Sequence, residues 1–91
     1  MAETTAMVSI SLHYWAGARA AAGVDDEVIE ADTVAAALRW ATQEHDDPHF
    51  ERVLRASSLL IDGLTARPAD LEQVRDHPVR VEILPPFAGG A

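Results

Sequence analysis

The chain has 91 residues, which is enough for one domain with a modest core and too few for two. Its 15 acidic residues outnumber seven basic ones and give a net charge of −8, which argues against binding to nucleic-acid phosphates. Cysteine is absent, which excludes disulfides, thiolate metal sites and cysteine nucleophiles from this chain.

Two sequence patterns bear on where the protein is expected to act. No run approaches the ~18 apolar residues of a membrane span, and the N-terminus lacks the basic start and apolar core of a signal peptide. We therefore expect a cytoplasmic protein with no membrane partner. The acidic balance fits a partner with a basic docking surface, and it equally fits plain solubility. Residues 1–6 are expected to be a disordered N-terminus.

The first predicted strand has an apolar residue at every second position: Val8, Ile10, Leu12 and Tyr14. An Ala-rich stretch, 16–22, predicts a short helix that Gly23 can end in a left-handed conformation. After an acidic turn over 25–27, residues 28–30 predict a short second strand at a sheet edge.

The main helix is predicted to begin near Thr33, whose hydroxyl can cap the free N–H groups of the first turn. Apolar residues at 34, 37, 38 and 41 place one face of this helix against the sheet. Asp46, Asp47 and Pro48 interrupt it, and the apolar residues at 50, 53 and 54 indicate a second, shorter helix.

The C-terminal half contains two further predicted strands. Residues 58–61 form a strand closed by Asp62-Gly63, a strong turn signal. A loop with one helical turn is expected over 67–71, and the apolar residues at 79, 81 and 83 predict the last strand. A helix between the first and last strands favours a parallel central pair, because a parallel connection needs a long crossover.

This order predicts an α+β protein with the β-grasp (ubiquitin-like) plan. We expect a mixed sheet of four to five strands packed on one main helix, with the domain covering residues 7–84. The last strand should lie beside the first in the middle of the sheet.

The sequence after this strand is the most unusual part of the chain. Pro85 and Pro86 have no N–H for a ladder, so they end the strand and hold the following residues extended. One apolar residue, Phe87, precedes the small residues Ala88, Gly89, Gly90 and Ala91. Residues 85–91 are therefore predicted to be an extended tail that can enter a narrow channel in a partner.

Polar and aromatic side chains elsewhere suggest few sites. His45 and His49 are four residues apart, but Pro48 breaks the helix that would align them, so we expect a solvated turn and no metal site. Trp15 follows the first strand and is the better candidate for an interface tryptophan, while Trp40 has no such position. Arg19 is expected to pair with nearby acidic residues.

Several segments together resemble the MoaD/ThiS family of ubiquitin-like sulfur carriers. They are Tyr14-Trp15-Ala16-Gly17-Ala18-Arg19 with Gly23, Thr33-Val34 at a helix start, and Ile83-Leu84-Pro85-Pro86-Phe87-Ala88-Gly89-Gly90. The likeness covers residues 8–90, and its diproline before Gly-Gly is typical of the small subunit of molybdopterin synthase. One departure is that the family ends at Gly-Gly, whereas the printed sequence continues to Ala91.

The resemblance implies a carrier without catalytic side chains or a bound cofactor. Gly90, after removal of Ala91, would carry the thiocarboxylate, and Gly89 would keep the stalk thin. The implied partners are an adenylating, sulfur-transferring activating enzyme that uses ATP, and the large subunit of molybdopterin synthase. Phe87, Pro85, Pro86, Ala88 and Trp15 would bind these partners. The alternatives are a carrier for thiamine or cysteine synthesis, and a non-catalytic ubiquitin-like modifier or binding module.

Overall fold

The structure is a computed structural model, and it describes residues 7–86. The strands are β1 (Val8–Tyr14), β2 (Asp26–Ala31), β3 (Ser58–Ile61), β4 (Leu64–Thr65) and β5 (Val79–Leu84). The helices are α1 (Ala16–Ala22), α2 (Val34–His45), α3 (Pro48–Ala56) and α4 (Pro68–Leu71). Within residues 7–86, none of the helices has both the length and the apolar character needed to cross a lipid bilayer.

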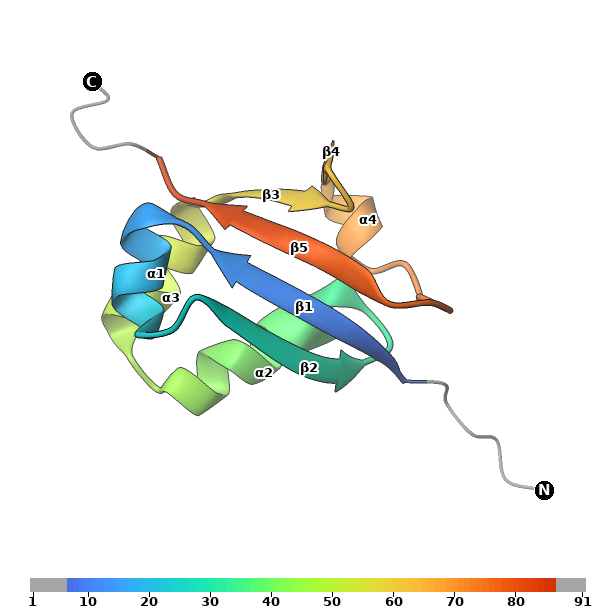
Figure 1. Cartoon of the computed structure of the whole chain (residues 1–91), viewed down its shortest axis with the longest axis horizontal. Helices are drawn as coiled ribbons and strands as arrows, with labels where there is room; N and C mark the ends of the chain where they lie inside the picture. Colours follow the sequence, from blue (N-terminus) through green and yellow to red (C-terminus); the bar gives the residue numbers. More distant parts are fainter. Residues whose placement is uncertain (1–6, 87–91) are drawn as a thin grey trace.

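The five strands form one mixed sheet in the order β2-β1-β5-β3-β4. β1 and β5 are parallel and lie in the middle, while the other three pairings are antiparallel (Figure 1). The predicted placement of the last strand beside the first, as a parallel central pair, is therefore confirmed. β4 was not predicted, because two exposed residues cannot show an alternating pattern; it pairs with β3 through the turn at Asp62 and Gly63, both of which have positive φ.

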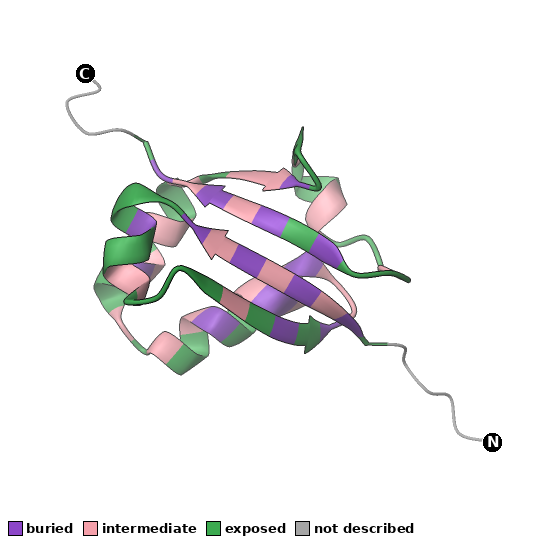
Figure 2. Cartoon of the chain, in the orientation of Figure 1, coloured by how far each residue is buried: buried purple, intermediate pink, exposed green. Residues whose placement is uncertain are grey.

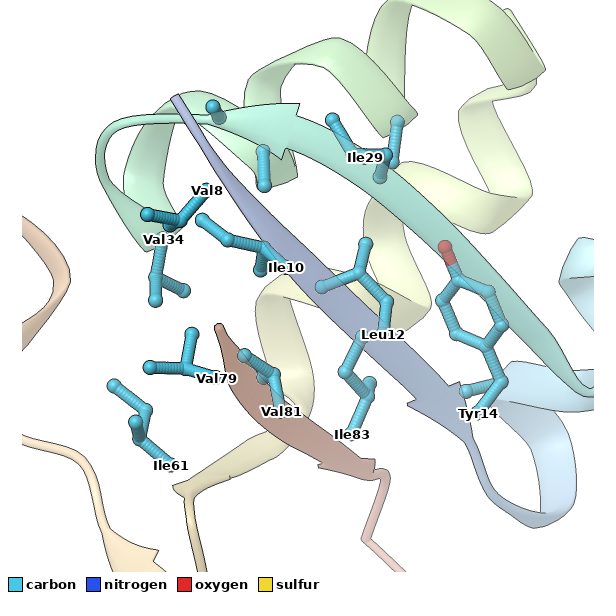
Figure 3. Packing of buried hydrophobic residues seen from close by; sticks show 14 of the residues in the cluster. Val8, Ile10, Leu12, Tyr14, Ile29, Val34, Ile61, Val79, Val81 and Ile83 are labelled. Atoms are coloured by element: carbon cyan, nitrogen blue, oxygen red, sulfur yellow. The ribbon is translucent and has the colours of Figure 1, made fainter. Parts of the chain in front are cut away.

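The helices cover one face of the sheet and leave the other face open (Figure 1). The inward side chains of β1 and β5 are fully or almost fully buried, and Figure 3 shows them meeting those of β2, β3 and α2. α2 is the longest helix, as predicted, but α1 and α3 also contribute to the core through Ala18 and Phe50. Burial alternates along the central strands, as expected for a sheet with one covered face (Figure 2).

The predicted helix boundaries have visible physical causes. The Thr33 hydroxyl accepts a hydrogen bond from the Ala36 N–H at 3.0 Å, which caps α2. α2 ends at Asp46, whose backbone is left-handed, and the Asp47 carboxylate then caps α3 by accepting from the His49 N–H at 2.9 Å. Pro48 occupies the first turn of α3, where a missing N–H costs nothing.

Two sequence-based predictions are wrong: the acidic turn over 25–27 and the solvated turn at His45. In both cases the structure shows a contact of the Glu27 side chain that was not predicted. Asp26 and Glu27 belong to β2 and not to an acidic turn, because they pair in register with His13 and Leu12 of β1. The Glu27 carboxylate accepts a hydrogen bond from the Tyr14 hydroxyl at 2.6 Å. Burial, followed by this bond and the Glu27 charge, raises the pKa of the Tyr14 phenol.

His45 is the second correction. Its side chain is only 15% exposed, so it does not lie in a solvated turn. The imidazole Nε2 lies 2.8 Å from the Glu27 carboxylate, and the ring stacks on Phe50 with centroids 4.2 Å apart. His45 therefore joins the end of α2 to β2 and α3.

Candidate functional site

The parallel pairing of β1 and β5 brings two predicted partner-binding segments together. Parallel strands end at the same sheet edge, so Trp15 after β1 and Pro85 after β5 emerge as neighbours. The Trp15 backbone N–H donates to the Ile83 carbonyl at 3.1 Å, which extends the contact beyond the strands. We call the surface formed by Trp15, Pro85 and Pro86 the tail root.

Helices α1 and α3 support the tail root from the covered side of the sheet. Pro85 is buried and Pro86 is exposed. Both line a small cavity of about 280 Å³ with Gly17 of α1 and residues of α3 that include Arg52 and Val53. The direction in which the chain leaves β5 is therefore set by packing on two helices.

A strained residue lies directly beside the tail root. Ala16 has a φ of 47°, a left-handed conformation that costs a residue with a Cβ about 1–2 kcal/mol. This conformation turns the chain from β1 directly into α1. It leaves Trp15 at the sheet edge, where its side chain is 46% exposed.

The Trp15 side chain is held by a polar network on the open face of the sheet. Its indole N–H donates to Glu82 Oε1 at 2.6 Å, and the Arg80 guanidinium donates to the other Glu82 oxygen. The Trp15 ring also meets the edge of His13, with centroids 4.7 Å apart, and His13 Nδ1 is paired with Asp26. We call these five residues the Glu82 network.

The network keeps Glu82 ionised. Burial alone would raise the pKa of Glu82, but the hydrogen bond from Trp15, the hydrogen bond and charge of Arg80, and the charge of His13 together hold it below its ordinary value. A carboxylate that accepts bonds from both Trp15 and Arg80 fixes the indole orientation near neutral pH.

Sequence reasoning found the tail root and missed the network behind it. Trp15, Pro85 and Pro86 lie together, whereas the predicted site residues Phe87, Ala88, Gly89 and Gly90 lie outside the described residues. Glu82 could have been found from the sequence. It lies two residues after Arg80, between inward-facing apolar residues, and the expected parallel pairing puts it beside His13.

One further prediction can be placed. Arg19 pairs with Asp25 at 3.7 Å, as expected for a local ion pair. In the part of the chain that the structure describes, no group of three or more histidine or acidic side chains is arranged to hold a metal ion. The tail root thus presents a defined surface with an exposed aromatic ring, and the Glu82 network behind it supplies an ordered carboxylate.

A scan of protein-family models and a search of curated proteins both found no match to this chain. Solved structures do match over nearly the whole chain. The small archaeal modifier protein 1 of Methanosarcina acetivorans has a TM-score of 0.75 at 23% identity, covering 92% of this chain and 98% of that one. The fold is the β-grasp fold.

Two further β-grasp neighbours carry molybdopterin-related names. A putative molybdopterin converting factor subunit 1 from Pyrococcus furiosus has a TM-score of 0.70 at 20% identity, with coverage of 88% and 99%. A Helicobacter pylori complex of subunits 1 and 2 of molybdopterin-converting factor matches with a TM-score of 0.63 at 14% identity, with coverage of 87% and 95%. In that complex, the similar protein is seen with a second subunit.

Proposed function

We propose that this β-grasp protein is a sulfur carrier whose C-terminal Gly-Gly is adenylated and thiocarboxylated for molybdopterin biosynthesis. The observation that carries the proposal is the tail root. A central strand, hydrogen-bonded on both sides, leads through a packed diproline into the sequence Phe87-Ala88-Gly89-Gly90. A rigid base followed by residues with small side chains suits the delivery of one reactive group into a partner's site.

The chemistry requires an activating enzyme. A carboxylate is a poor electrophile, so its oxygen first attacks ATP, releases pyrophosphate and becomes an acyl-adenylate. A persulfide then displaces AMP, and a thiol cleaves the resulting sulfur–sulfur bond to leave a thiocarboxylate on Gly90. In this scheme Gly89 and Gly90 keep the stalk thin, and no side chain of the carrier acts as a base.

The tail root would be part of the docking surface for both partners, the activating enzyme and the large synthase subunit. Trp15 presents an exposed ring at the edge of the sheet where β5 ends, and we assign Phe87 and Ala88 to the same contact. The two-subunit complex of the Helicobacter pylori neighbour supports a large-subunit partner.

A second candidate function is protein modification, in which Gly90 forms an isopeptide bond with a target. The name of the Methanosarcina acetivorans neighbour favours this alternative, since that protein is called a modifier protein. Sulfur delivery to thiamine or cysteine synthesis uses the same activated carboxylate and remains the third candidate.

The decisive experiment compares two chains, one ending at Gly90 and one at Ala91, with an activating enzyme, ATP and a sulfur source. We expect mass spectrometry to show the exchange of one oxygen for sulfur on the Gly90 chain, and much slower exchange on the Ala91 chain. An added residue displaces the carboxylate by up to ~3.6 Å, and a misplacement of ~1 Å can cost about a hundredfold in rate. Equal rates would contradict the assignment of Gly90 as the functional end.

The same reaction separates carrier from modifier. Thiocarboxylate that is consumed by a large synthase subunit and a pterin precursor supports the molybdopterin role. If the activated chain instead becomes linked to lysines of other proteins and transfers no sulfur, the modifier function is correct.

A further inference from the structure

A second surface lies on the helical side of the molecule and is separated from the tail root by α3 and the start of β3. Three cavities of about 280, 470 and 280 Å³ adjoin one another there. The first and second share Leu38, Leu54 and Arg55, and the second and third share Thr65, Ala66 and Arg67. They form one groove that runs from α2 and α3 past β3 and β4 to α4.

The groove has an apolar floor and a basic rim. Its central cavity is floored by Leu38, Leu54, Leu59 and Leu71. Four of the chain's seven basic residues, Arg39, Arg55, Arg67 and Arg75, line the three cavities. Only two of its 15 acidic residues, Glu51 and Asp70, do so, and the central cavity contains neither. The groove lining is therefore positive by two charges in a chain whose net charge is −8.

Arg55 and Arg67 are presented to solvent and weakly engaged, whereas Arg75 is half-buried and donates to the Asp70 carbonyl at 2.7 Å. Arg55 is 79% exposed and pairs with Glu51 one helical turn away at 2.9 Å. Arg67 is 82% exposed and lies 3.5 Å from Asp70. Exposed ion pairs of this kind contribute about 0–1 kcal/mol, so both guanidinium groups can exchange their partners for other carboxylates at little cost.

The groove and the tail root use opposite sides of α3. Glu51, Leu54 and Arg55 face the groove, whereas Arg52 and Val53 line the cavity under the diproline. The groove therefore shares no lining residue with the cavity under the diproline.

We propose that this arginine groove binds an acidic amphipathic segment of another protein. Its apolar side chains would cover the leucine floor, and its carboxylates would contact Arg55 and Arg67. The positive charge of the lining favours an acidic partner. A basic segment would be repelled there and attracted to the rest of this acidic surface. The proposal goes beyond the sulfur-carrier function, since the binding site excludes the tail.

The test uses synthetic peptides of about 14 residues with leucines at helical spacing and flanking glutamates. One control peptide has lysine in place of each glutamate, and another has serine in place of each leucine. Each is titrated into the isotope-labelled full chain while backbone amide shifts are recorded by NMR. We expect only the Glu/Leu peptide to shift the groove amides, along α2, α3 and α4, and to leave unchanged the amide of Trp15, the one tail-root residue with a backbone N–H.

Charge reversal gives matched variants. Arg55→Glu and Arg67→Glu each change the net charge by two. Arg19→Glu makes the same change and is the control, because Arg19 lies on α1 outside the groove. We expect each groove variant to weaken peptide binding about tenfold and Arg19→Glu to weaken it less than about twofold. All three positions are exposed, so circular dichroism should report an unchanged fold.

Three results would overturn the proposal. One is equal binding of the glutamate and lysine peptides at the groove amides, and another is equal loss of affinity in Arg19→Glu. The third is a set of concentration-dependent shifts at the groove without any peptide, which would assign the surface to a second copy of this chain.

Discussion

Trp15 and Trp40 have nearly the same exposure, 46% and 45%, but very different surroundings. Trp15 lies at the tail root and is oriented by Glu82, whereas Trp40 lies on α2. If the tail root is the docking surface, Trp15→Ala should weaken binding to the large subunit about tenfold or more, as interface tryptophans commonly do.

Trp40→Ala is the matched control and should leave that affinity unchanged. Isothermal titration calorimetry measures both variants. Equal effects of the two substitutions, or none from Trp15→Ala, would show that the contact lies elsewhere.

The Glu82 network gives a pH-dependent prediction. Because the pKa of Glu82 is lowered in the folded state, its ionised form stabilises the fold above the ordinary value of 4.5, and this contribution is lost as pH falls through the lowered pKa. Glu82→Gln should therefore be less stable than the parent chain at pH 7, by about 1 kcal/mol, and the difference should shrink at acid pH. Urea unfolding at several pH values tests this expectation, and a difference independent of pH would contradict it.

At the scale of the elements, the Thr33 cap makes α2 a well-defined target. Thr33→Ala removes the acceptor for the Ala36 N–H and should lower the free energy of unfolding by about 1 kcal/mol. Thr33→Ser keeps the hydroxyl and should recover most of that loss. Denaturant unfolding compares the variants, and equal stability of the Ala and Ser forms would show that the cap contributes little.

The elements were predictable where local chemistry decides them. The alternation of β1 and β5, the Thr33 cap and the Asp62-Gly63 turn act within a few residues, and all three were read correctly from sequence. The role of Glu27 was not, because its bonds to Tyr14 and His45 span 13 and 18 residues. Such contacts depend on strand register and helix docking, which no local pattern encodes.

The residues of the candidate site and the groove also fall into those that the sequence could predict and those that it could not. The tail motif and Trp15 could be recognised because they stand beside strand ends, where the chain direction is predictable. The Glu82 network and the arginine groove gather residues from several elements, so their composition appears only once those elements are packed.

At the scale of the whole molecule, the net charge of −8 affects how partners approach. If a basic partner surface attracts this chain, the association rate should fall as salt rises, since screening shortens to ~8 Å near physiological ionic strength. Stopped-flow measurements with the large subunit over a range of salt concentrations test this. An unchanged rate would leave solubility as the only role of the charge.

The parallel contact between β1 and β5 also has a mechanical consequence. A load applied at Pro86 runs along β5, which is bonded to β1 on one side and to β3 on the other. If the N-terminal end of β1 is held, this load acts on the β1–β5 hydrogen bonds in shear, all together, and does not peel them apart one by one. A pull on the tail against that anchor must therefore break these hydrogen bonds together before β5 separates from β1.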